Sequence, residues 1–273
     1  MASAQLASPS LELTTSSPQA QVIQIPSTQP RHPSRHILED RREYLEKCVP
    51  LYKLALRGDW NAARHMIDAD RSLLNAAITK EWGTLLHVVA GTNHVHFVNQ
   101  LLELLEPDDL ELQDFNGNTA FCFAAASGKL QIAAMMIKKN AILPEIRGGE
   151  RVTPLYIAVL LGKGDMARHL YALTTNTSEQ NDWTALFFLC IKNELYDIAL
   201  QMLQKHSMLA LARDENNDTG LHVLARKPCG FSGPGEWYLQ NQIFNSRKFL
   251  QSLLLGKLGN WVYVLCMLAN FSD

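Results

Sequence analysis

The sequence predicts an all-α solenoid in which helix-turn-helix units stack in a row, with short β-turn fingers between them. Three observations lead to this prediction. A six-residue pattern recurs six times, its copies are almost evenly spaced, and the ninth residue after each start is nearly always Gly or Asn. A single unit of this length cannot bury its own apolar face, so stability has to come from contacts between neighbouring units. We therefore expect one elongated core.

The recurring pattern is clearest in the fourth copy, TPLYIA. The six copies read VPLYKL, TLLHVV, TAFCFA, TPLYIA, TALFFL and TGLHVL, and they begin at Val49, Thr84, Thr119, Thr153, Thr184 and Thr219. Successive starts are 35, 35, 34, 31 and 35 residues apart. Both the T-P-L-H-x-A pattern and a period of about 33 residues are typical of ankyrin repeats. We expect an ankyrin-repeat domain over residues 43–228, with about six units of which the sixth is degenerate.

Each unit carries signals for where its first helix begins and ends. The threonine that opens a copy can cap the helix through its hydroxyl, as expected for Thr84, Thr119, Thr153, Thr184 and Thr219. Nine residues after each start the chain must turn, and the residues there are Gly58, Asn93, Gly128, Gly162, Asn193 and Pro228. Gly and Asn adopt the left-handed conformation at the lowest steric cost. Five units should therefore end their first helix there, and the sixth should turn differently.

The second helices and the fingers are also visible in the sequence. An apolar residue stands eighteen positions after the start of the first five copies, at Ile67, Leu102, Ile137, Tyr171 and Met202. We expect these side chains to face the neighbouring units. The stretches DFNGN (114–118) and DENND (214–218) are typical of turns, and each lies just before a copy of the pattern. They predict β-turn fingers.

The two flanks differ from the repeats. Residues 1–42 are rich in Ser, Pro, Thr and Gln, which predicts a disordered tail. Within it we expect RHPSR (31–35) to be solvated linker, with a phosphorylation or docking site as the weaker alternative. Residues 229–243 predict a Gly/Pro-rich loop. Residues 244–273 predict a C-terminal helix, as a delayed second helix of unit six, and an apolar tail. The uninterrupted apolar run 261–269 is too short to span a bilayer, whereas residues 249–269 reach that length but include polar residues.

Composition narrows the function. The 273-residue chain is 47% apolar and has a formal net charge of −2, so it gives no electrostatic reason to expect nucleic acid as a partner. Protein partners are expected instead. Its five cysteines lie far apart without a CxxC pair, which predicts free thiols in a reducing compartment. The first residues lack a signal-peptide pattern. We expect the chain in the cytoplasm; the resemblance given below adds the cytoplasmic face of the plasma membrane as a second location.

No group of residues indicates catalysis. His87 and His222 occupy a position that holds Tyr, Cys or Phe in other units, so we interpret them as structural. The HVH stretch at His94 and His96 lacks a third ligand at a suitable spacing. Cys229 follows Arg226 and Lys227, so an enzyme using this thiol is a weaker alternative. We expect no enzyme activity, no cofactor, no metal and no small-molecule substrate.

What remains is a surface for a protein partner. Aromatic and charged side chains just before the pattern are suited to interfaces, because large aromatics are favoured as anchors. The candidate partner-binding residues are Lys80, Glu81, Trp82, Phe115, Asn116, Asp182 and Trp183. An equally good interpretation is that these aromatics close each finger against the next unit. Thr84, His87, Thr119, Thr153, Thr184, Thr219, His222, Gly58, Gly128 and Gly162 are assigned structural roles in the repeats.

Several stretches also resemble a known family. LYKLALRGDWNAARHMID, ITKEWGTLLHVVAG, DFNGNTAFCFAAASGKLQIAAMMI and GLHVLARKP are similar to the ankyrin region of plant ankyrin-repeat membrane proteins that carry a C-terminal PGG domain. The resemblance covers about residues 43–228. It implies an ankyrin domain on the cytoplasmic side, anchored by several transmembrane helices, with roles in defence, cell-death or salt-stress signalling.

The family pattern does not continue after residue 230, where neither the PGG motif nor a multi-span hydrophobic block follows. We therefore expect a shortened form, either a splice product or a truncated gene model. The preferred hypothesis is a soluble adaptor that docks a protein partner, with full-length ankyrin membrane relatives among the candidates. The alternative is a membrane-associated signalling protein held by residues 249–269.

Overall fold

The computed structural model describes residues 30–174 and 180–226. Within these ranges every regular element is a helix, and the only β-pairing consists of three isolated bridges. The predicted loop at 229–243 and the predicted C-terminal helix and tail at 244–273 lie outside the described residues. So do Pro228, Cys229, Cys266 and residues 1–29 of the predicted tail.

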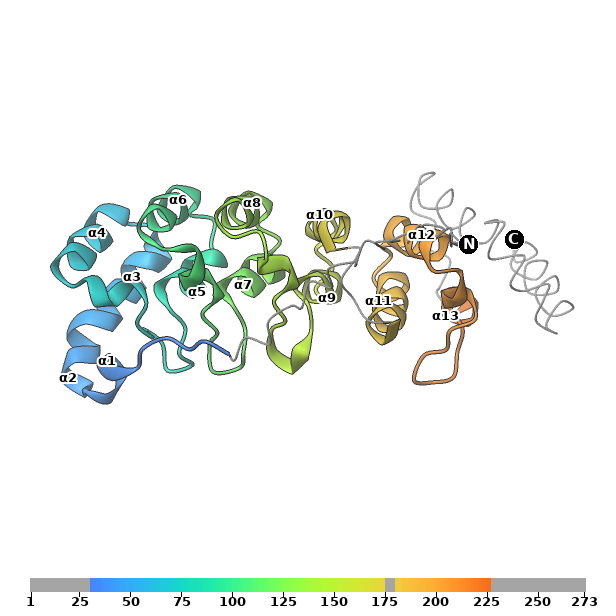
Figure 1. Ribbon diagram of the computed structural model, residues 1–273, viewed down its shortest axis with the longest axis horizontal. Helices are drawn as coiled ribbons and strands as arrows, with labels where there is room; N and C mark the ends of the chain where they lie inside the picture. Colours follow the sequence, from blue (N-terminus) through green and yellow to red (C-terminus); the bar gives the residue numbers. More distant parts are fainter. Residues whose placement is uncertain (1–29, 175–179, 227–273) are drawn as a thin grey trace, which may run out of the picture.

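The helices form two parallel rows, as Figure 1 shows. The first-helix row comprises α3 (Val49–Arg57), α5 (Leu85–Ala90), α7 (Ala120–Ser127), α9 (Pro154–Leu160), α11 (Gln180–Lys192) and α13 (Gly220–Ala225). The second-helix row comprises α4 (Trp60–Ala69), α6 (Val95–Leu104), α8 (Leu130–Lys139), α10 (Gly164–Thr174) and α12 (Tyr196–Lys205). Short 3-10 turns follow the second helices: η2 (Arg71–Leu74), η3 (Pro107–Glu111), η4 (Leu143–Glu145), η5 (Gly149–Arg151) and η6 (Ser207–Ala210). Each unit therefore contacts mainly its neighbours, as expected of a stacked repeat.

The core is continuous along the stack, from Ile37 in α1 to Leu224 in α13. Four of the five predicted second-helix positions, Ile67, Leu102, Tyr171 and Met202, are buried. The fifth, Ile137, is only half-buried, and the preceding Met136 is fully buried instead. The predicted spacing is therefore confirmed, with a shift of one residue in α8.

Turn residues follow the prediction in three units and depart from it in two. Gly58, Gly128 and Gly162 have positive φ angles of 74°, 70° and 65°. Asn93 does not, because α5 already ends at Ala90. Asn193 does not have a positive φ either. Helix α11 continues to Lys192, and Glu194, one residue after Asn193, takes the left-handed conformation with φ 62°. The Asn193 amide donates a hydrogen bond to the Val159 carbonyl (2.9 Å), so this side chain links units four and five.

Both predicted fingers are present. In the finger at 114–118, the Asp114 carboxylate accepts hydrogen bonds from the backbone of Asn116 (2.9 Å) and Asn118 (2.8 Å), and Gly117 has φ 83°. The finger at 214–218 repeats this arrangement, with Asn217 in the left-handed position. The Asp and the Gly or Asn of each stretch therefore fold the turn that their residue types favour.

Unit five departs from the predicted boundaries. Thr184 was expected to cap a first helix, but α11 begins four residues earlier, at Gln180, and Thr184 lies inside it. The stretch before Thr184 lacks the Asp and Gly or Asn pattern of the two fingers, and the spacing to the previous copy, 31 residues, is the shortest of the five. A helix start therefore replaces the final residues of a finger.

The predicted disordered tail is too long. Residues 36–48 form α1 (His36–Glu39), α2 (Arg41–Glu43) and the π-helical turn η1 (Tyr44–Cys48), with Ile37 fully buried. The RHPSR stretch is also wrongly predicted as solvated linker, because Pro33 is buried and Ser34 forms a parallel bridge with Ala76. These contacts join residues far apart in the sequence, and the local composition does not indicate them.

Candidate functional site

Each first helix buries one face and exposes another. Residues two, five and six positions after the start of a copy pack into the core, as Leu86, Val89 and Ala90 do in α5. Residues four, seven and eight positions after the start of a copy lie on the other side of the helix, since residues three or four apart share a helix face. Equivalent positions of stacked units form a line along the solenoid. The first-helix row therefore presents one continuous surface.

This surface carries apolar side chains that the core does not cover. We define the apolar row as Leu56, Val88, Phe123, Ile157, Leu160 and Leu161, all at position four, seven or eight of their units. Leu56, Phe123, Leu160 and Leu161 are exposed, and Val88 and Ile157 are half-buried. The Phe123 ring meets the edge of the His87 ring, with centroids 5.7 Å apart, so adjacent units touch along the row. These residues were not among the candidates predicted from the sequence, although the repeat pattern fixes their positions.

His87 holds the second unit to the third. Thr84 caps α5 and forms a capping box with His87, whose Nδ1 accepts from the Thr84 backbone (3.2 Å) and lies 2.8 Å from the Thr84 hydroxyl. Because Nδ1 accepts, Nε2 carries the proton and donates to the Asn118 carbonyl in the next finger (3.1 Å). Burial lowers the pKa of His87 below its ordinary value. A neutral ring in this place bonds rather than transfers protons.

The other pattern residues have comparable local roles. Thr219 caps α13 and forms the same box with His222, which is exposed. The Thr153 hydroxyl accepts from the backbone of Tyr156 (3.2 Å). Thr119 stands at the start of α7, with its hydroxyl 3.5 Å from the Cys122 sulfur. The threonine position is therefore a helix start in these units, and unit five is the exception.

Five of the predicted partner-binding residues come together on adjacent fingers. Trp82 has φ 62° and its ring lies edge-on to Phe115, with centroids 4.9 Å apart. The Phe115 backbone donates to the Glu81 carbonyl (2.8 Å), which joins the two fingers directly. Phe115 is 63% exposed, whereas Trp82 is half-buried. Lys80, Glu81 and Asn116 are exposed beside them. One aromatic thus closes the finger contact and the other faces solvent.

Comparison with protein families agrees with this geometry. A family model described as ankyrin repeats, in three copies, matches residues 86–181, which span units two to four. The fold is an ankyrin-repeat solenoid. The described residues extend the ankyrin stack beyond the matched region in both directions, from α3 to α13.

Comparison with individual proteins adds little. A chain in the crystal structure of the yeast ribosomal protein Rps3 in complex with its chaperone Yar1 is similar to this chain. The match has a TM-score of 0.45 and 19% sequence identity, and it covers 52% of this chain and 99% of that one. No curated protein matches the sequence.

Trp183 follows the second interpretation, in which the aromatic closes a contact between units instead of anchoring a partner. It is only 5% exposed, because α11 begins at Gln180 and places it inside a helix rather than on a finger. Its ring stacks on His206 (centroids 5.2 Å apart, planes at 28°) and lies edge-on to Tyr171 (6.1 Å). It therefore closes the contact between ankyrin units four and five. The side chain of the neighbouring candidate, Asp182, lies outside the described residues.

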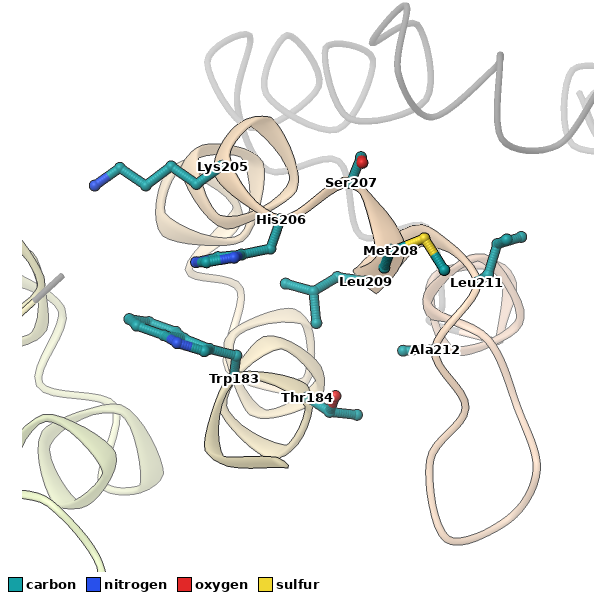
Figure 2. A pocket seen from close by; sticks show the side chains of 9 residues that line it. All are labelled: Trp183, Thr184, Lys205, His206, Ser207, Met208, Leu209, Leu211 and Ala212. Atoms are coloured by element: carbon teal, nitrogen blue, oxygen red, sulfur yellow. The ribbon is translucent and has the colours of Figure 1, made fainter. Parts of the chain in front are cut away.

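A hollow of about 650 Å³ lies beside Trp183, between α11, α12 and η6. In Figure 2, the His206 ring faces Trp183, whereas the Ser207 side chain points away on the other side of the backbone. The two side chains do not form a nucleophile and base. Apolar Met208, Leu209 and Leu211 line the remainder. This arrangement suits packing or apolar contact better than chemistry.

His94 and the three described cysteines have structural surroundings. His94 bonds the Leu56 carbonyl through Nε2 (2.9 Å), which ties units one and two together, while His96 is exposed. Cys48, Cys122 and Cys190 are free and buried. Burial raises the pKa of all three thiols, that of Cys48 to about 11, which disfavours the reactive thiolate.

Two further findings concern the described part of the chain. It holds no group of three His, Cys, Asp or Glu side chains that could bind a metal ion. Nor does it contain a helix with the length and apolar character needed to cross a lipid bilayer.

Proposed function

We propose that the chain is a non-catalytic adaptor whose ankyrin stack docks a protein partner on the apolar row. The observation that carries this proposal is the alignment of exposed Leu56, Phe123, Leu160 and Leu161 on the first-helix row, where they add nothing to the core. Exposed apolar side chains gathered on one face are typical of protein interaction sites. Ankyrin domains are generally interaction modules, which supports the same reading.

The pathway we propose comes from the resemblance to plant ankyrin-repeat membrane proteins with a PGG domain. On this proposal the chain works in defence or stress signalling, in the cytoplasm or at the cytoplasmic face of the plasma membrane. Full-length ankyrin membrane proteins of that family are then candidate partners. The membrane-associated alternative requires residues 249–269 to hold the chain at the membrane, and fractionation of plant cells with and without these residues separates the two.

The test of docking uses two matched substitutions. Leu160 on α9 is 51% exposed and belongs to the apolar row, whereas Leu173 on α10 is 49% exposed and belongs to the second-helix row. The tagged chain, its Leu160→Glu variant and its Leu173→Glu variant are each used to recover bound proteins from plant lysate. We expect a protein that the first and third chains recover and the Leu160→Glu chain loses. Equal recovery by all three chains would exclude the apolar row as the docking surface.

A further inference from the structure

Residues 30–35, which we call the N-terminal strap, lie across the turns of ankyrin units one to three. The Gln113 backbone donates to the Arg31 carbonyl (2.7 Å), and the His32 Nδ1 lies 3.0 Å from the Gln113 carbonyl. Further along, the Ser34 backbone N–H donates to the Asn75 carbonyl (3.3 Å), and the Ser34 carbonyl accepts from the Ala77 backbone N–H (2.8 Å). In Figure 1 this blue segment runs beneath α5 and α3 towards α1. It is therefore bound as an extended peptide, largely through its backbone.

The side chains of the strap contact Trp82, one member of the aromatic pair Trp82–Phe115. The Arg35 guanidinium lies over the Trp82 ring, 4.4 Å from its centroid, and the His32 ring meets the edge of the same indole at 5.5 Å. Arg31 pairs with Asp108 (3.1 Å). Arginine over an indole face is an attractive arrangement, because the ring presents negative potential to the cation. The strap thus places one arginine over Trp82 and another against Asp108.

We propose that the Trp82–Phe115 surface is a docking site for an extended, arginine-bearing segment of a partner protein, and that the strap occupies it in cis. This inference rests on the proposed adaptor function and adds the chemistry of the partner and a means of regulation. A partner segment would replace the strap by making the same contacts, with an arginine over Trp82 and backbone hydrogen bonds to Gln113 and Ala77.

The chemistry around the surface selects such a segment. The turn beside Gln113 carries the exposed or half-buried acidic side chains Glu106, Asp108, Asp109 and Glu111, which favour a cationic ligand. The backbone edge at 75–77 and 113, which the strap occupies, pairs with an extended chain, as in other cases where a peptide adds a strand to an edge. Phe115, 63% exposed, leaves apolar area next to the arginine site that the strap does not cover.

The strap is held weakly enough to be displaced. Its described anchoring consists of three backbone hydrogen bonds, the contact of His32 with the Gln113 carbonyl, the buried Pro33, one exposed ion pair and the contacts to Trp82. Side chains of the ion pair are 43% and 72% exposed, so it contributes little. What favours the strap is its tether, which gives it a high effective concentration. A partner that also docks on the apolar row has the same advantage.

The test uses full-length chains and one probe, a fluorescein-labelled peptide with the sequence of residues 29–36 (QPRHPSRH), followed by fluorescence anisotropy. The released chain carries R31A and R35A, which remove the ion pair to Asp108 and the cation over Trp82. The control chain carries R41A and R42A, which change the net charge equally on α2. We expect the released chain to bind the peptide about fivefold more tightly than the wild type, and the control chain to match the wild type.

Two further measurements identify the site. In the released chain, Trp82→Ala should weaken binding, and so should replacing the peptide residue equivalent to Arg35 with Ala. Phe115→Ala should weaken it as well, because it removes the ring that packs edge-on against Trp82. Circular dichroism melts establish that each chain folds, and the exposed Phe115 provides a variant that folds whatever Trp82→Ala does. Equal peptide affinity of released and wild-type chains, or binding indifferent to Phe115→Ala, would overturn the proposal. Partner capture that depends on Leu160 is measured separately, so the adaptor function can stand when this inference fails.

Discussion

Replacing His87 with alanine removes the side chain that ties the second ankyrin unit to the third. The wild-type ring makes three polar contacts, with the Thr84 backbone (3.2 Å), the Thr84 hydroxyl (2.8 Å) and the Asn118 carbonyl (3.1 Å). Each is worth about 1 kcal/mol net, and the substitution also leaves a buried void. We expect His87→Ala to lower the free energy of unfolding by about 3 kcal/mol.

The matched control is His222→Ala. His222 makes the same two contacts with Thr219 but is exposed, so its removal should cost about 1 kcal/mol or less. Urea unfolding followed by circular dichroism at pH 7.5 measures both variants. Equal losses for His87→Ala and His222→Ala would contradict this prediction, because burial and the bond to the next finger would then contribute nothing.

Three more predictions follow from described residues. The pKa of His87 is lower in the folded chain than in the unfolded chain, so the unfolded chain takes up a proton first as the pH falls. The free energy of unfolding should therefore decline below about pH 6.5, and it should decline less steeply in His87→Gln. Urea titrations across pH 5–7.5 measure both chains. Trp183→Ala should destabilise the chain by about 3–5 kcal/mol, because the residue is only 5% exposed. Phe115→Ala should cost under about 1 kcal/mol, because Phe115 is 63% exposed. A calorimetric comparison that ranks the two losses the other way contradicts the assigned burial. Gly128→Ala should lower the free energy of unfolding more than Gly162→Ala in the same assay. The positive φ of both glycines makes an alanine there cost about 1 kcal/mol. Only the new Cβ at position 128 would also press on the Lys163 side chain, at 3.1 Å.

The sequence predicted the repeat register because local residue types set it. Thr84, Thr153 and Thr219 begin helices, and Asp114 and Asp214 fold fingers, through contacts within a few residues of each other. Such contacts recur with the period of the repeat, so a single sequence is enough to find them.

The parts of the structure that could not be predicted from the sequence depend on contacts between distant residues or on an interruption of the repeat period. The strap bonds to Gln113, 81 residues away from His32, and belongs to no repeat, so its polar composition suggested a linker. Trp183 was assigned to a finger by analogy with Trp82, but α11 starts early and buries it. Two signals in the sequence show that unit five differs: the short 31-residue spacing before Thr184, and the missing Asp and Gly or Asn pattern of a finger in the stretch before it.

The central claim is that the apolar row docks a protein partner. Its most direct test is the equilibrium affinity of a recovered partner for the wild-type, Leu160→Glu and Leu173→Glu chains, measured by isothermal titration calorimetry. Because a leucine buried at an interface contributes about 1.5–3 kcal/mol, we predict that Leu160→Glu weakens binding at least about tenfold while Leu173→Glu leaves it unchanged. Unchanged affinity for Leu160→Glu, or an equal loss in both variants, would contradict the account.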